Sequence, residues 1–141
     1  MSELPSRESL LEANAAFYQA FESLDMRAMA ALWEESDRLF CVHPGWKALY
    51  GREAVIGSWR NIMSNTGRIR FTITGLRAHI DGLVGRVTLH EEIQSIAGGQ
   101  RHSASAIATN LFSFDEEEGL WRLFHHHSSL AGVPETTDIV N

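Results

Sequence analysis

Apolar residues recur at helical spacing in three stretches of the first half of the chain, at about 6–24, 25–33 and 51–65. Ser6 and Asp25 stand where the first two helices should begin, and both residue types are preferred N-caps. Between the second and third stretches, the apolar run 39–43 ends at Pro44 and Gly45, which is typical of a strand entering a turn. The first half therefore predicts the order helix, helix, strand, helix.

From Gly67 onward the apolar spacing changes to two, which indicates strands. Asp81-Gly82, Gly98-Gly99 and the acidic segment 115–119 separate four such segments, as the turns of an antiparallel meander do. This order predicts an α+β fold in which three helices lie across one face of a curved antiparallel sheet. We expect a single domain at 1–141, with a structured core at about 6–130 and a surface tail at 131–141.

Composition narrows the class of protein. The 141 residues carry a formal net charge of -6 and the basic residues form no stripe, so nucleic acid is not an expected partner. The single cysteine, Cys41, excludes an internal disulfide and any cysteine-rich zinc site. The polar N-terminus is unlike a secretory signal, and no apolar run reaches membrane-spanning length. These features predict a cytoplasmic protein that does not bind membranes.

The third long strand carries a row of small residues on one face. Its even positions include three alanines, followed by Asn110 and then Phe112. Small side chains leave space that helix residues or a ligand must fill. A buried amide without a partner costs about 1–3 kcal/mol, so Asn110 needs a hydrogen bond. It is either a structural tie to backbone or water, or a donor aimed at the oxygen of a ligand.

His43 ends the first predicted strand, directly before a turn. An imidazole at the open end of a sheet is a common general acid or base, although a histidine that caps the turn by a backbone hydrogen bond is the other reading. Trp46 and Trp59 follow closely and either wall the same site or belong to the core. In the first helix, Tyr18 is either a core residue with its hydroxyl at the rim or a donor to a bound carbonyl.

Three consecutive histidines, His125, His126 and His127, lie in the last predicted strand. Because side chains alternate, His125 and His127 share one face and His126 has the other. The first and third could seed a metal site with His43 or His90, but packing at a strand end or a dimer face is the favoured reading, and no metal is expected. The adjacent carboxylates Glu91-Glu92 point to opposite faces, which argues against a carboxylate dyad.

Several segments resemble the SnoaL-like branch of the nuclear transport factor 2-like superfamily. They are VHPGW at 42–46, GREAVIGSW at 51–59 and WRLFHHHSS at 121–129, and the resemblance covers most of the chain. It implies a cone-shaped curved sheet closed by three helices around a pocket, the fold also called cystatin-like, and a homodimer formed through the other face of the sheet. The superfamily includes isomerases, dehydratases, cyclases and modules without catalysis.

The resemblance also implies roles for individual residues. Laid against the ketosteroid isomerases of this superfamily, His43 falls at the position of their catalytic base and Asn110 at that of a donor to the substrate oxygen. Tyr18, or Phe17 if the helix shifts by one residue, falls near their oxyanion tyrosine. The same alignment turns Phe124 and His126 toward the pocket, unless the turn length exchanges them for Leu123, His125 and His127.

Two functions remain open from the sequence. The first is a cofactor-independent proton-transfer enzyme, an isomerase, dehydratase or cyclase, acting on a small apolar carbonyl compound. His43 would be the base, Asn110 and Tyr18 would bind the oxyanion and His126 would assist. The wall residues would be Phe17, Trp46, Trp59, Phe112 and Phe124. The second is a noncatalytic ligand-binding or dimerisation module with the same fold.

Overall fold

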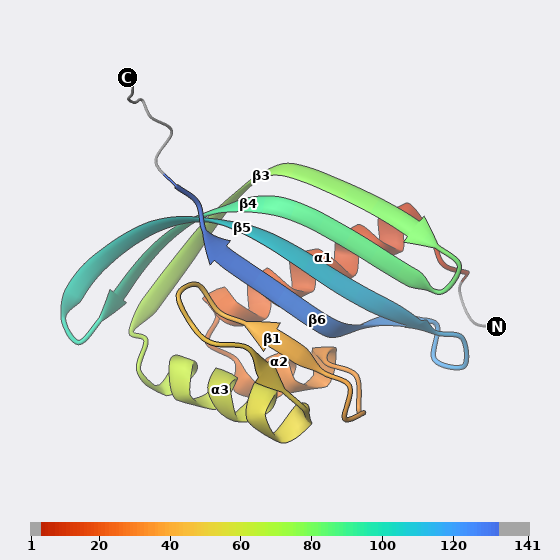
Figure 1. Ribbon diagram of the computed structural model, residues 1–141, viewed down its shortest axis with the longest axis horizontal. Helices are drawn as coiled ribbons and strands as arrows, with labels where there is room; N and C mark the ends of the chain where they lie inside the picture. The colour runs from red at the N-terminus through yellow and green to blue at the C-terminus, as the bar shows by residue number, and fades with distance from the viewer. Residues whose placement is uncertain (1–3, 133–141) are drawn as a thin grey trace.

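The computed structural model describes residues 4–132, which form three helices and one long sheet (Figure 1). Most of the sheet follows the helices in the chain. The helices are α1 (Arg7–Glu22), α2 (Met26–Leu32) and α3 (Arg52–Ser64). The strands are β1 (Phe40–Val42), β2 (Leu49–Tyr50), β3 (Arg68–Asp81), β4 (Val84–Ala97), β5 (Gln100–Asp115) and β6 (Leu120–Leu130). The predicted α+β class, helix order and meander are confirmed. The expected tail at 131–141 lies, apart from residues 131–132, outside the described residues.

The predicted caps of the first two helices are present. The Ser6 side chain accepts a hydrogen bond from the backbone N–H of Ser9, whose own side chain closes a capping box with the backbone of Ser6. Asp25 accepts from the backbone N–H of Ala28 at 3.0 Å. None of the helices within residues 4–132 is long and apolar enough to cross a membrane.

The six strands form one sheet in the order β2-β1-β6-β5-β4-β3. The four long strands make the predicted antiparallel meander, and β1 extends it by pairing parallel to β6. Strand β2 was not predicted, because two residues are too few to show a period. Parallel pairing places Cys41 beside His126, so His43, two residues later, comes to the same face of the sheet.

Helix α1 crosses the concave side of the sheet, which we call the inner face (Figure 1). Its buried residues follow one stripe: Leu10, Asn14, Phe17, Tyr18 and Ala20. The helix approaches β4 so closely that a Cβ on Gly85 would lie 2.7 Å from Leu10 Cδ1. A larger residue there would force the Leu10 side chain to shift, so glycine permits the close approach of α1 to the sheet.

Two irregularities bend the long strands. The pairing of β3 with β4 shifts between Thr74 and Arg77, and Gly75 in that interval has a φ of 62°. The pairing of β5 with β6 shifts next to Phe112, which faces Leu123, whereas Leu111 faces His125. Phe124 is therefore an extra residue in β6, a β-bulge that changes the alternation of the side chains after it.

Candidate functional site

Six polar side chains are buried between α1 and the inner face of the sheet. This buried polar cluster consists of Asn14, Tyr18, Glu91, Asn110, His126 and Ser128, and each of these residues is at most 6% exposed. Two come from α1 and four from three neighbouring strands. Polar groups in such positions must bond with one another, because water does not reach them.

The register of the strands brings these residues together. Asn110 on β5 lies directly opposite His126 on β6. Glu91 on β4 pairs with Ala106, and Ser128 on β6 pairs with Ala108. The row of small residues noticed in the sequence therefore leaves space on β5, and a hydrogen bond of 2.7 Å from the Ser128 hydroxyl to Glu91 Oε1 spans it.

The amide of Asn110 is the centre of the cluster. Its Nδ2 donates to Asn14 Oδ1 at 2.9 Å and to the Tyr18 hydroxyl at 3.3 Å, so its Oδ1 must be an acceptor. That oxygen lies 2.5 Å from His126 Nδ1, which is therefore the protonated nitrogen of the ring. Burial lowers the pKa of His126 well below its usual value, with a further contribution from His43, so the ring is neutral and its Nε2 carries a lone pair.

Glu91 is a buried carboxyl that the sequence analysis missed. It accepts from the Tyr18 hydroxyl at 2.6 Å and from Ser128 at 2.7 Å. Within residues 4–132 it has no cationic partner, since the ion pairs there are Arg38–Glu34 and Arg122–Asp115. Burial raises the pKa of Glu91, against the effect of the two hydroxyl donors.

Tyr18 is held in its protonated form. Burial and the adjacent Glu91 carboxyl raise the pKa of the Tyr18 hydroxyl well above its usual value. The hydroxyl therefore keeps its proton and donates a hydrogen bond to the carboxylate. The pair forms a short, charge-assisted hydrogen bond in a site of low dielectric constant.

His43 lies beside the cluster, at 4% exposure. Its Nε2 is 2.9 Å from the Ser58 hydroxyl, which donates its own proton to the Val55 carbonyl at 2.7 Å. Ser58 can then only accept from His43, which leaves the lone pair on Nδ1. Burial lowers the pKa of His43 to about 4, and its ring centre is 6.4 Å from that of His126.

Aromatic rings fill the space around His43. Trp59 packs edge-on against His43 with ring centres 4.6 Å apart, and against Phe17 at 5.6 Å. The indole N–H of Trp59 is buried without a hydrogen-bond partner in the described part of the chain. Trp46 contacts the outer side of His43 at 4.8 Å and is 42% exposed. Trp46 is thus the ring that separates His43 from solvent.

The structure places two predicted wall residues elsewhere. Phe124 is only half-buried, and its ring lies 4.0 Å from the guanidinium carbon of Arg38. The bulge is the reason, because it turns Leu123 and His126 inward and leaves the extra residue out of the alternation. Phe112 is fully buried in the apolar core, opposite Leu123. Each predicted alternative for β6 is therefore correct for one residue only, because His126 comes from the first and Leu123 from the second.

A groove between α1 and β3 leads to the cluster from outside. Its volume is about 240 Å³, and it is lined by Leu11, Asn14, Ala15, Tyr18, Gln19, Glu22, Phe71, Ile73 and Leu76. Most of this lining is apolar. The two residues that belong to the cluster give the groove a polar floor, which suits a small apolar molecule carrying an oxygen.

The three histidines of β6 face different environments. His126 is inside, whereas His125 stacks on Phe40 with ring centres 4.6 Å apart and His127 is exposed. His125 and His127 thus lie across the sheet from His43. Within residues 4–132, no group of three or more His, Cys, Asp or Glu side chains is arranged to hold a metal ion.

Sequence reasoning passed over Glu91, Ser58 and Ser128. The alternation rule placed Glu91 and Glu92 on opposite faces, which is correct, but the rule was used only to exclude a dyad. One of two adjacent carboxylates in a strand with a buried face must point inward, and that was the available signal. Ser58 and Ser128 gave no signal of their own.

A family model and several relatives match this chain. The model of the SnoaL-like domain matches residues 10–133. A solved structure from Streptomyces avermitilis, proposed to be a dehydratase of the NTF2-like family, is 34% identical. The match covers 89% of this chain and 96% of that one, with a TM-score of 0.82.

A more distant solved structure shares the fold, and a curated protein matches in sequence. A ketosteroid isomerase-like protein from Erwinia carotovora is 17% identical over 89% of this chain and 96% of its own, with a TM-score of 0.74. The F-box protein SKIP8 of Arabidopsis thaliana is 26% identical over 94% of this chain. The chain spans about half of that relative, 54% of its length.

Proposed function

The chain belongs to the SnoaL-like family, and from that premise we propose that it is a cofactor-independent enzyme that removes water from a small apolar β-hydroxy carbonyl compound. The observation that carries the proposal is Glu91, a buried carboxyl with a raised pKa and no cationic partner in the described part of the chain. Such a group lowers stability, and groups of this kind gather at sites of proton transfer. The 34% identical relative proposed to be a dehydratase supports this reaction class.

The proposed reaction is an elimination. The neutral ring of His43 takes a proton at Nδ1 from the carbon next to the carbonyl, and the electrons of that C–H bond form the C=C bond. The C–O bond of the β-hydroxyl breaks, and the hydroxyl leaves as water with the proton of Tyr18. Glu91 accepts the hydrogen bond of the Tyr18 hydroxyl in the resting site and orients it. Proton exchange with solvent resets His43 and Tyr18 after product release.

Asn110 has a positioning role in this scheme. Both amide hydrogens of Asn110 are engaged, with Asn14 and Tyr18, so Asn110 does not donate to the substrate in this arrangement. It holds the Tyr18 hydroxyl and fixes the tautomer of His126. The substrate enters from the groove between α1 and β3, where Tyr18 supplies the hydroxyl of the groove's polar floor.

The test compares two tyrosines. A panel of small β-hydroxy ketones is incubated with the protein, and the ultraviolet absorbance of the conjugated product is followed. We expect turnover by the wild type and by Tyr50→Phe, whose exposed ring lies far from the cluster. Tyr18→Phe should lower kcat at least ~100-fold, the usual size of a general-acid contribution. Equal rates for the two variants, or no turnover of any panel member by the wild type, would contradict the proposal.

The second candidate is a noncatalytic ligand-binding module. The close packing of Trp59 against His43 and Phe17 favours it, because these rings fill the space in which a substrate would meet His43. For this module we expect a ligand that copurifies with the protein and is found unchanged by native mass spectrometry. Its conversion on incubation would instead favour the enzyme.

A further inference from the structure

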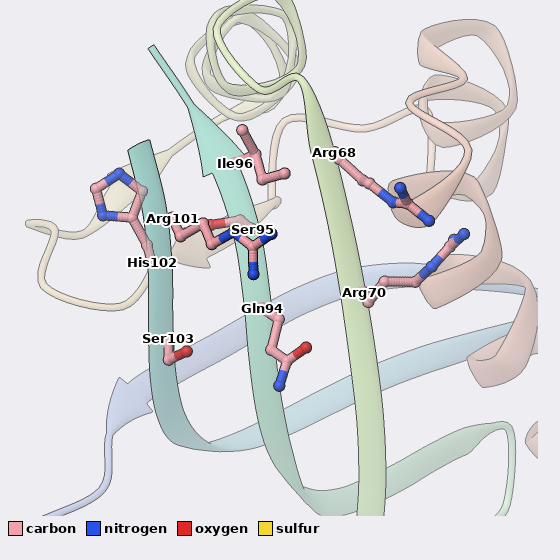
Figure 2. A pocket seen from close by; sticks show the side chains of 8 residues that line it. All are labelled: Arg68, Arg70, Gln94, Ser95, Ile96, Arg101, His102 and Ser103. Atoms are coloured by element: carbon pink, nitrogen blue, oxygen red, sulfur yellow. The ribbon is translucent and has the colours of Figure 1, made fainter. Parts of the chain in front are cut away.

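Three arginines lie near one another at the curved end of the sheet. None of them belongs to the buried polar cluster. Arg68 and Arg70 lie on β3, and Arg101 lies on β5. A hollow of about 340 Å³ is formed by these three with Gln94, Ser95, Ile96, His102 and Ser103 (Figure 2). We call it the arginine hollow. Its volume is at the lower end of the range for sites that hold small molecules.

The strand register sets the three arginines around one patch of the sheet. Arg68 pairs with Ile96, and Ile96 pairs with Arg101, so these residues form one row across three strands. Arg70 lies in the next row of the same face, roughly 7 Å along the strand, and Arg101 lies two strands from Arg68, about 9.5 Å away. In Figure 2, Arg101 reaches across β4 toward β3. Arg68 and Arg70 extend the other way, past the far side of β3, so both side chains must turn back over the sheet for one anion above this patch to contact all three arginines (Figure 2).

No ion pair within residues 4–132 involves the arginine hollow, and the Glu22 carboxylate beside Arg70 accepts a hydrogen bond of 2.7 Å from the Phe71 N–H. The ion pairs recorded there, Arg38–Glu34 and Arg122–Asp115, involve none of the three arginines. The nearest carboxylate along β4, Glu92, accepts a hydrogen bond from the Ser105 hydroxyl instead. The whole chain has a net charge of -6, so the cluster is a local excess that runs against the composition.

An anion would relieve the repulsion among these groups. Guanidinium groups bind carboxylate and phosphate oxygens through paired N–H donors, and they bind them more specifically than ammonium groups do. The amide of Gln94 and the hydroxyl of Ser103 line the same hollow and supply neutral donors. We propose that the arginine hollow binds a small molecule with two or more neighbouring negative charges, either an organic diphosphate or a di- or tricarboxylate.

Calorimetric titration of the full chain with inorganic pyrophosphate and, separately, with citrate tests this site. We expect saturable binding of at least one probe, and the preferred probe tells whether phosphate or carboxylate chemistry is read. Replacing one charged donor should weaken that binding about tenfold or more in Arg68→Gln and in Arg101→Gln. Arg60→Gln, on the exposed side of α3, is the matched control and should bind as the wild type does.

Three results would overturn the proposal. The first is no saturable binding of either probe at low salt. The second is equal weakening by Arg60→Gln, which would reveal a nonspecific effect of net charge. The third is tight binding of a single-stranded oligonucleotide, abolished by the Arg68 and Arg101 substitutions, in a protein that ignores both small probes. Because these arginines lie outside the buried polar cluster, none of these results bears on the dehydratase proposal.

Discussion

Acidification should destabilise this protein through the buried ring of His43. Its pKa is about 4 in the folded chain, against 6.5 for a free histidine, because burial disfavours the charged ring. The unfolded chain therefore binds more protons than the folded chain between these two values, and stability is lost as the pH falls through this range. The contribution is fully present above pH 6.5.

The size of the effect follows from the two pKa values. At pH 5.0 the unfolded ring is almost fully protonated and the folded ring is mostly neutral, which lowers the free energy of unfolding by about 2 kcal/mol relative to pH 7.5. The full interval would give about 3 kcal/mol. His126 acts in the same direction, because burial lowers its pKa as well. Glu91 acts in the opposite direction, because its raised pKa favours the folded state at low pH.

A difference between two proteins isolates His43 from the other groups. Urea unfolding, followed by tryptophan fluorescence, is measured at pH 7.5 and 5.0 for the wild type and for His43→Gln, whose amide can still donate to Ser58. We expect the pH-dependent loss to be about 2 kcal/mol smaller in the variant. His79→Gln, an exposed histidine, controls for the substitution itself. Identical losses in the wild type and His43→Gln would refute the assignment of a buried neutral ring.

Further predictions concern packing, the carboxyl and the outer face. Gly85→Ala should lower the free energy of unfolding by about 1–3 kcal/mol, because its Cβ would meet Leu10, and Leu10→Ala should make the glycine substitution less harmful in a double-mutant cycle. Glu91→Gln removes a buried charge and keeps the shape of the side chain. It should therefore change the free energy of unfolding at pH 7 by less than about 1 kcal/mol while abolishing turnover. A large loss of stability would mark Glu91 as structural. Ile107 is 46% exposed on the outer face, and if that face forms the expected homodimer, Ile107→Lys should halve the mass seen by light scattering; an unchanged mass would exclude Ile107 from any interface.

Local signals in the sequence predicted most of the fold. Ser6 and Asp25 marked the helix starts because a cap is a contact within one turn. The turn residues marked the meander for the same reason. The two-residue strand β2 was missed, since its existence depends on pairing with β1, a contact that no local pattern records.

The site was predicted in part. Tyr18, Asn110 and His126 do meet in one buried cluster, whereas His43 lies beside it behind Trp59. The placement of Phe124 failed because a bulge depends on the match between two strands rather than on either strand alone. The position of Glu91 depended on register in the same way.

The bulge at Phe124 takes up one extra residue of β6 without changing which histidine faces the interior. Deleting that one residue would keep the same pairs, Leu123 with Phe112 and His125 with Leu111, so that His126 would stay inside. A regular strand that kept Phe124 would instead turn His126 outward and its two neighbours inward. Three adjacent histidines thus provide an imidazole on either side of the sheet whatever the frame.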